Sequence, residues 1–151
     1  MLKSIVDLEI LLRAIDVTSD VILIYRVDAA SGELVLLYMN EAYTRQTGYV
    51  REEAVGKSLD AFRLAMPDDD GMREIRNALA QGRAGEAELV SYRRDGSSFW
   101  NQITIHPIVD HGRISHWISV ERDISDDVAS TSALAEKHDR LLALVRAARR
   151  I

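Results

Sequence analysis

Apolar and polar positions along the chain predict two groups of β-strands separated by short helices. Runs of roughly four to eight residues, rich in β-branched and aromatic side chains and bounded by turn residues, are typical of strands. The predicted strands are residues 21–27, 34–38, about 86–93, 98–109 and 113–122. The last three are joined by predicted turns at Asp95-Gly96 and His111-Gly112. Asp-Gly is a strong hairpin signal, because both residues tolerate the positive φ angles of tight turns.

Short helical segments fill the interval between the two groups of strands. The predicted segments are residues 41–47, 51–55 and 58–65, followed by a longer helix to about residue 81. The first two end at Gly48 and Gly56, because glycine readily adopts the left-handed conformation found at a helix C-terminus. The carboxylates of Asp68, Asp69 and Asp70 complement the positive end of the longer helix's dipole. Two strands, several helices and three antiparallel strands predict an α+β fold.

Both ends of the chain carry apolar side chains at helical spacing. These are Ile5, Leu8, Leu12 and Ile15 at one end, and Leu134, His138, Leu141, Val145 and Ala148 at the other. The second set follows a heptad seam, although a single helix that folds back onto a sheet gives the same periodicity. Because both flanks carry such stripes, we expect a parallel homodimer through the flanking helices. The predicted units are an N-terminal helix (1–16), a core (17–125) and a C-terminal helix (126–151).

Composition places the chain among ordinary globular proteins and narrows its partners. Of 151 residues, 47% are hydrophobic and 28% are charged. The net charge of −5 argues against nucleic-acid binding, which usually needs a basic surface. No apolar run reaches the roughly 18–20 residues of a membrane span, and the N-terminal segment lacks the features of a signal peptide. We therefore expect a cytoplasmic protein that contacts neither nucleic acid nor membrane.

Residues with catalytic or metal-binding chemistry form no recognisable motif. The chain contains no cysteine, which excludes disulfides, thiolate catalysis and cysteine metal sites. Its four histidines lack the spacing of a metal-ligating motif, and the run 68–70 is interpreted as a helix cap rather than a calcium loop. The sequence has no phosphate-binding loop, dinucleotide fingerprint or Gly-x-Ser-x-Gly motif. It therefore predicts a domain that is not an enzyme and holds no metal.

The stretch Ser91-Tyr-Arg-Arg-Asp-Gly-Ser-Ser-Phe-Trp-Asn101 resembles the central hairpin of PAS domains, most closely that of the flavin-binding LOV branch. LOV domains usually read Asn-Tyr-(Arg/Lys)-(Lys/Arg)-Asp-Gly-x-x-Phe-Trp-Asn there. Further matching segments, in order, are 40–43, 47–49, 53–56, Pro107 and 123–125. The last of these, Asp-Ile-Ser, is similar to the Asp-Ile-Thr motif that links PAS cores to output helices. The resemblance covers about residues 15–125 and implies a PAS fold: a five-stranded antiparallel sheet with short helices on one face, flanked by a helix at each end.

The resemblance to LOV domains also implies candidate cofactor-binding residues. LOV domains hold the flavin ring edge with two asparagines and a glutamine, which map onto Ser91, Asn101 and Glu121. Only Asn101 matches, because serine has no amide and an ionised carboxylate cannot donate a hydrogen bond. The alternating donors and acceptors of a flavin ring edge are therefore matched at one position of the three.

The phosphate side of the resemblance is mixed as well. Arg76 matches a phosphate-contacting arginine, whereas the usual Gly-Arg-Asn-Cys-Arg-Phe-Leu-Gln block is Gly56-Lys-Ser-Leu-Asp-Ala-Phe-Arg63 here. The reactive cysteine is replaced by Leu59 and the following arginine by Asp60, while Lys57 could supply part of the lost positive charge. A cysteinyl–flavin adduct is excluded, since the chain has no thiol. Haem is disfavoured, because haem-binding PAS domains usually take their axial histidine from the long helix, which has none here.

Together, the residues and the resemblance predict a sensory or dimerisation module. A ligand, redox change or partner would alter how the sheet packs on the flanking helices. Residues 121–125 would then pass the change to the C-terminal helix and to an effector such as a histidine kinase or diguanylate cyclase. Two alternatives stay open: a flavin-binding light or redox sensor without adduct chemistry, and a ligand-free module whose pocket is filled by its own side chains. The candidate pocket residues are Leu59, Phe62, Ile75, Leu79, Leu89, Asn101, Ile103 and Ile118.

Overall fold

The computed structural model describes residues 7–59 and 69–149 of the chain. Helices and strands follow one another in the predicted order. The strands are β1 (Val21–Val27), β2 (Leu34–Met39), β3 (Gly85–Tyr92), β4 (Ser98–Asp110) and β5 (Arg113–Asp123). The helices are α1 (Leu8–Val17), α2 (Glu41–Thr47), α3 (Arg51–Ala54), α5 (Asp70–Gln81) and α6 (Ser125–Arg149). Most of the helix predicted over 58–65 lies outside the described residues, as do Asp60, Phe62 and Asp68.

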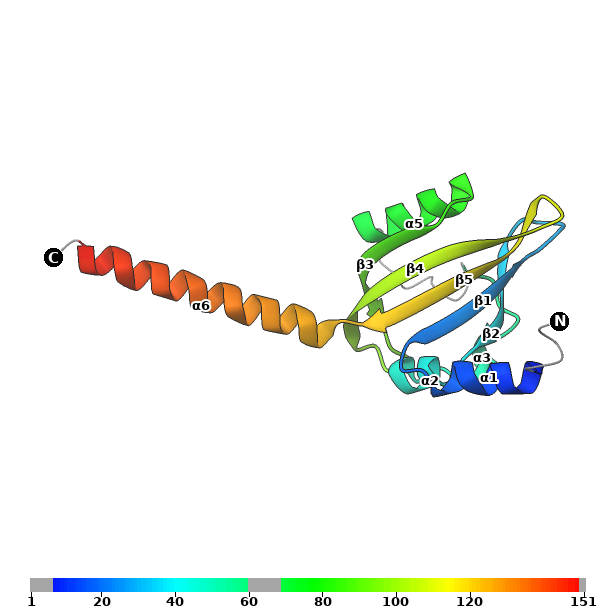
Figure 1. The fold of residues 1–151 in the computed structure, drawn as a ribbon, viewed down its shortest axis with the longest axis horizontal. Coiled ribbons are helices and arrows are strands. Elements are labelled where there is room, and N and C mark those ends of the chain that lie inside the picture. The colour runs from blue at the N-terminus through cyan, green and yellow to red at the C-terminus, as the bar shows by residue number, and fades with distance from the viewer. Residues whose placement is uncertain (1–6, 60–68, 150–151) are drawn as a thin grey trace.

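The five strands form one antiparallel sheet in the order β2-β1-β5-β4-β3 (Figure 1). β5 lies at the centre of the sheet, paired with β1 on one side and β4 on the other. Only Ile124 separates the end of β5 from the start of α6. The predicted α+β class with a five-stranded antiparallel sheet is confirmed, and its central strand leads to the C-terminal helix.

Alternating side chains along β4 and β5 give the sheet a buried inner face and a partly open outer face. Buried positions recur at every second residue, as the two-residue period of a strand requires. The inner face shares one apolar core with α2, α3 and α5: Val21, Leu23, Tyr25, Leu36, Met39, Ala42, Tyr43, Ala54, Met72, Ile75, Ala78, Leu89, Ile103, Ile105 and Trp117. Ile118 lies between Trp117 and Ser119, which are both buried on the inner face. Its side chain therefore points to the outer face, and its predicted place in the pocket is wrong.

Capping interactions fix where two of the helices begin and end. Asp69 accepts a hydrogen bond from Met72 N at 2.8 Å at the start of α5, and Asp7 accepts one from Ile10 N at 2.9 Å in α1. The interpretation of the acidic run as a helix cap is confirmed at Asp69. Gly82 ends α5 with a φ of 65°, in the left-handed region that glycine adopts without strain.

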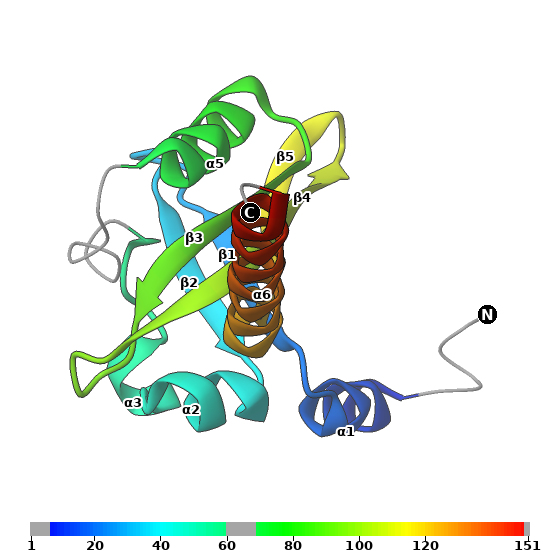
Figure 2. The same ribbon diagram turned by 90° about the vertical axis from the view of Figure 1, so that its left-hand side faces the viewer.

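α6 projects away from the sheet as a single helix of 25 residues (Figure 1). Figure 2 views it nearly end-on, with the sheet and the other helices behind it. None of its described residues is buried, and apolar side chains of its predicted seam, such as Leu134 and Leu141, are exposed. α6 therefore does not fold back onto its own sheet. Within the described part of the chain, no helix is long and apolar enough to cross a membrane.

Candidate functional site

Four polar side chains meet on the inner face, where β3, β4 and β5 lie side by side. Ser91, Asn101, Ser119 and Glu121 are all buried. Asn101 Nδ2 donates to Ser91 Oγ at 3.1 Å and to Glu121 Oε2 at 3.0 Å, and Ser119 Oγ donates to Glu121 Oε1 at 3.0 Å. The structure thus brings together the three predicted ring-edge residues. Ser119 was not predicted from its residue type, although its place two residues before Glu121 on one strand puts it on the same face.

The carboxylate of Glu121 fixes the orientation of the Asn101 amide. If that amide were turned around, its oxygen would face a carboxylate oxygen, and two acceptors cannot bond. The Asn101 side chain is only 2% exposed, and its Oδ1 has no hydrogen-bond partner among the described residues. A buried acceptor without a partner costs about 1–3 kcal/mol. Such an atom in an otherwise bonded cluster is a candidate contact for a ligand.

The buried cluster does not match the edge of a flavin ring. Both hydrogens of the Asn101 amide and the hydroxyl hydrogen of Ser119 already go to protein oxygens. An ionised Glu121 offers acceptors only. The cluster therefore lacks the donor that a glutamine would supply at position 121. In addition, these side chains are almost fully buried in the protein alone, so little space remains beside them in this conformation.

A separate cavity of about 410 Å³ opens at the other end of the inner face, beside the turn between β1 and β2. Its apolar wall consists of Val27, Leu34, Leu59, Leu79, Ile114 and Trp117. Its polar lining consists of Ser31, Glu33 and Ser58, with Gly32 between the first two. A volume of this size is within the range of small-molecule sites. Two predicted pocket residues, Leu59 and Leu79, contribute to it.

The remaining predicted site residues lie elsewhere. Ile75, Leu89 and Ile103 belong to the packed core. Arg76 on α5 and Lys57 after α3 are exposed, and neither is among the described residues that line the cavity. The backbone carbonyl of Lys57 accepts a hydrogen bond from Leu36 N at 3.0 Å. The structure therefore does not bring the two predicted phosphate-binding cations to the cavity.

One carboxylate joins the sheet to the first turn of α6. Asp123 Oδ1 accepts a hydrogen bond from Ser125 N at 2.9 Å, and Asp123 Oδ2 forms an ion pair with Arg93 Nη2 at 3.1 Å. Arg93 Nε also donates to the backbone oxygen of Gln46 in α2 at 3.0 Å. Ser125 Oγ accepts from Trp100 N at 3.0 Å. We call Arg93, Trp100, Asp123 and Ser125 the C-terminal junction.

The C-terminal junction directly follows the buried cluster on the same strands. Arg93 comes two residues after Ser91, and Asp123 two residues after Glu121. Asn101 pairs with Asp123 across β4 and β5. Residues two apart on a strand share a face and lie roughly 6–7 Å from each other. A change in the hydrogen bonds of the cluster would therefore act next to the carboxylate that caps α6.

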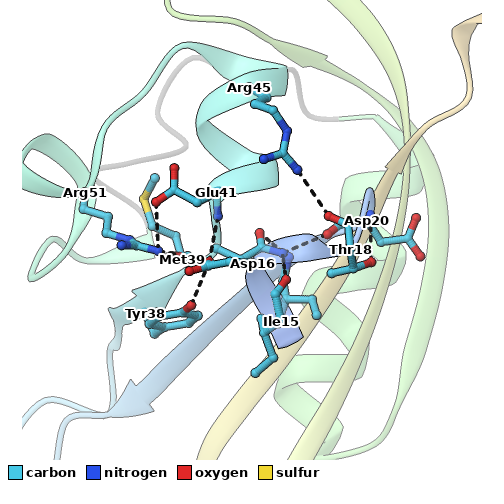
Figure 3. A network of polar contacts seen from close by, with 11 residues as sticks. Ile15, Asp16, Thr18, Asp20, Tyr38, Met39, Glu41, Arg45 and Arg51 are labelled. Atoms are coloured by element: carbon cyan, nitrogen blue, oxygen red, sulfur yellow. Dashed lines mark hydrogen bonds and ion pairs between the residues drawn. The ribbon is translucent and has the colours of Figure 1, made fainter. Parts of the chain in front are cut away.

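A second polar network ties α1 to the core (Figure 3). Asp16 Oδ1 accepts hydrogen bonds from Tyr38 Oη, Glu41 N and Arg51 Nη2, each at 3.1 Å. Arg51 also donates from Nε to the backbone oxygen of Met39 at 3.0 Å. Burial and the hydrogen bond to Asp16 raise the pKa of Tyr38 above its usual value.

Asn40 completes this N-terminal junction from inside the protein. Its side chain is fully buried, and Nδ2 donates to the backbone oxygens of Ile15 at 3.0 Å and Asp20 at 2.9 Å. Oδ1 accepts from Ile22 N at 3.0 Å. One side chain thus links the end of α1, the following turn and β1. We call Asp16, Tyr38, Asn40 and Arg51 the N-terminal junction.

Residues 19–126 match the family model of the PAS domain. The chain is 34% identical over 119 residues to the bacterioopsin transcriptional activator of Halobacterium salinarum, covering 76% of this chain and 18% of that protein. It is 34% identical over 112 residues to blue-light-activated histidine kinase 1 of Erythrobacter litoralis, covering 74% of this chain and 31% of the kinase. The chain thus spans less than a third of either relative.

A solved structure of similar fold is that of an RNA-binding Light-Oxygen-Voltage receptor, with a TM-score of 0.73 and 29% identity. That similarity covers 91% of this chain and 40% of the receptor. The light-state structure of the Aureochrome1 LOV domain, at 23% identity and a TM-score of 0.61, shows the same fold over 77% of this chain. These similarities extend the resemblance from sequence motifs to the arrangement of the whole sheet and its helices.

Proposed function

This chain belongs to the PAS domain family, and we propose that it is a sensory module that relays a ligand, redox or partner signal through α6 to an effector domain. The observation that carries the proposal is the position of Asp123. This residue ends the central strand, caps α6 and pairs with Arg93, immediately beside the buried cluster of Ser91, Asn101 and Glu121.

The relay would work as a shift between two populated conformations. A signal that alters the hydrogen bonds of Glu121 or Asn101 favours one arrangement of the adjacent Arg93–Asp123 pair over another. Because Asp123 also binds Ser125 N, the direction of α6 changes with that arrangement. A signal can shift this equilibrium only to the extent that it interacts differently with the two conformations.

The exposed seam of α6 supports a homodimer through the flanking helices. Leu134, Leu141 and Val145 recur at heptad-like spacing, and at least half of each side chain is exposed. Isolated helices that lack tertiary contacts are marginally stable in water. Pairing with the α6 of a second copy would bury these side chains and stabilise the helix. A parallel pair would place both C-termini together, where they could act on two effector domains.

The effector would be either a domain covalently attached to this one or a separate cognate protein. The relatives named above include a histidine kinase and a transcriptional activator, and the chain matches only a fraction of each. We propose that the domain itself is not an enzyme. In the described ranges, no group of three or more His, Cys, Asp or Glu side chains is arranged to hold a metal ion.

A flavin-binding light or redox sensor is the second candidate function. It is favoured by the names of relatives such as the blue-light photoreceptor of Listeria monocytogenes and by the retained Asn101. Ser91 and Glu121 oppose it for the hydrogen-bonding reasons given above. A visible absorption spectrum of protein expressed with added flavin tests it directly: structured absorption in the blue supports this function, and a featureless trace contradicts it.

Spin labels on α6 test the relay itself. Because the chain has no cysteine, Lys137→Cys on the exposed part of α6 gives one labelling site per protomer. Double electron–electron resonance measures the distance between the two labels of a dimer. We expect Glu121→Gln to change this distance. The matched control is Glu52→Gln, an exposed residue of α3, which should leave the distance unchanged. An unchanged distance in Glu121→Gln would contradict the relay, and a monomer would contradict the dimer.

A further inference from the structure

We propose that the cavity beside the β1–β2 turn binds a small amphiphilic cation, an aromatic or aliphatic ring that carries an ammonium group. This inference rests on the proposed sensory function and names the ligand class that the cavity selects.

The apolar wall supplies the site for the ring. Leu34, Leu79 and Ile114 line the cavity together with Trp117, whose side chain is only 3% exposed. A ring that enters this space exchanges contact with water for contact with apolar side chains, which is favourable in proportion to the area covered. Tryptophan also has the aromatic face that most strongly attracts a nearby cation. The wall therefore suits an apolar body and tolerates an adjacent positive charge.

Among the described residues, the polar lining of the cavity carries one charge, and it is negative. Glu33 is the one charged side chain among the described residues that line the cavity. Ser31 Oγ donates its hydrogen to Asp28 Oδ2 at 2.7 Å and accepts one from Glu33 N at 3.2 Å. The hydrogen bonds from Ser31 lower the pKa of the neighbouring Asp28, which also forms an ion pair with Arg26 Nη1 at 3.4 Å. One hydroxyl of the lining is thus already committed as a donor, and the charge of the described lining is that of Glu33 alone.

A phosphate group would meet the wrong charge here. Phosphate monoesters carry roughly −1.5 to −2 charges near neutral pH and bind where cations or N–H donors converge. The two predicted phosphate-binding residues, Arg76 and Lys57, are exposed and absent from the described cavity lining. The unpartnered Oδ1 of Asn101, further along the inner face, is likewise an acceptor. This single acceptor suits a ligand group that donates a hydrogen bond.

Fluorescence of Trp117 measures binding to this cavity. Trp100 and Trp117 are the two tryptophans of the chain, and Trp100 lies 41% exposed on the outer face. The variant Trp100→Phe therefore leaves a single reporter in the cavity wall. The probes are phenethylamine, 2-phenylethanol and 3-phenylpropionate, which share a phenyl ring and a two-carbon spacer but carry a positive, neutral or negative end. Riboflavin and its 5′-phosphate form a second pair, which differs by the phosphate alone.

Because Glu33 is exposed, we expect phenethylamine to bind about two- to fivefold more tightly than 3-phenylpropionate at low salt, the size of one favourable ion pair at a surface. Glu33→Gln should bring this ratio close to one, whereas Glu136→Gln on the exposed part of α6 should leave it unchanged. Added salt should also reduce the ratio. The inference is overturned if no phenyl probe binds, if 3-phenylpropionate binds as tightly as phenethylamine, or if the flavin phosphate binds better than riboflavin.

The failure of this inference is distinguishable from the failure of the relay. Phenethylamine binding that leaves the distance between spin labels at residue 137 unchanged would uphold the ligand class and contradict ligand relay through this cavity. A distance change produced by Glu121→Gln, without binding of any phenyl probe, would uphold the relay and overturn the ligand class.

Discussion

The two flanking helices are attached to the core in different ways. The N-terminal junction holds the end of α1 through side chains of β2 and α3, through the backbone N–H of Glu41 in α2, and through the buried Asn40. The C-terminal junction holds only the first turn of α6, through Asp123 and Ser125, and residues 131–149 of that helix are exposed. Neither helix has a buried residue in the described ranges, so we propose that these polar contacts keep the end of α1 in the framework of the domain and leave α6 the more easily reoriented helix.

The largest loss of stability should come from removing the buried side chain of Asn40 in the N-terminal junction. Asn40→Ala leaves Ile22 N and the carbonyls of Ile15 and Asp20 without their partners, so we expect the free energy of unfolding to fall by about 2–4 kcal/mol. Urea denaturation measures the loss. The control is Asn77→Ala, an exposed residue of α5, which should change stability by less than about 0.5 kcal/mol. An equal loss of stability in Asn77→Ala and Asn40→Ala would contradict a special role of Asn40 in the N-terminal junction.

A smaller and more local effect is expected at the C-terminal junction. Asp123→Ala removes a helix cap and the partner of Arg93, so the free energy of unfolding should fall by about 1–2 kcal/mol. Amide hydrogen exchange should accelerate most in the first turn of α6 and little in β1 or β2. Asp139→Ala serves as the control, since Asp139 is exposed and lies beyond the first turn of α6. Uniform acceleration across the sheet would show that this junction also supports the core.

Alkaline pH should also lower the free energy of unfolding through the N-terminal junction, but by less than the two substitutions above. The pKa of Tyr38 is higher in the folded protein than in the unfolded chain, so its contribution is complete at neutral pH and is lost as pH rises through the folded-state pKa. Between pH 8 and about pH 11, the wild type should therefore lose more stability than Tyr38→Phe, by less than about 1 kcal/mol. Parallel urea titrations measure the difference. Identical pH slopes would argue against the Tyr38–Asp16 bond.

The smallest change in the stability of the core should come from a substitution in the apolar seam of α6. Leu141→Asp lies on an exposed face, so we expect the unfolding midpoint of the sheet to move little while the dimer dissociates. Light scattering measures the mass, and tryptophan fluorescence follows the core. Leu37→Asp, an exposed position on β2, is the matched control for an added charge. If both substitutions left the mass unchanged, the helix seam would not be the dimer contact.

Local signals predicted much of this fold. Turn residues and alternating apolar positions located all five strands, although β4 continues to Asp110 and β3 begins at Gly85. The Asp16–Arg51 pair escaped prediction, because it joins half-exposed charges 35 positions apart and no local pattern marks such a contact. The direction of α6 was equally hidden, since its periodicity fits both an extended helix and one folded onto the sheet.

The candidate site was predicted in part, from the resemblance to LOV domains and from the apolar pattern of the chain. The resemblance predicted that Ser91, Asn101 and Glu121 belong to one site. In the structure, Asn101 donates hydrogen bonds to both other side chains. It also suggested Arg76 and Lys57, which are exposed and are not among the described residues that line the cavity. Glu33 was not predicted, since a single carboxylate in a surface turn is common. It becomes a candidate ligand contact only because the structure places it in the lining of the cavity.

The attachment of α6 by one turn has a consequence for how such domains can be recombined. An α-helix turns by about 100° and advances by about 1.5 Å per residue. A protein fused after α6 would therefore face a direction set by the number of residues between Ser125 and the fusion point. Linkers that differ by seven residues would present the fused partner in nearly the same angular phase, whereas linkers that differ by two would place it on nearly the opposite side. Helical phase, rather than contacts with the sheet, would determine which fusions respond to the sensor.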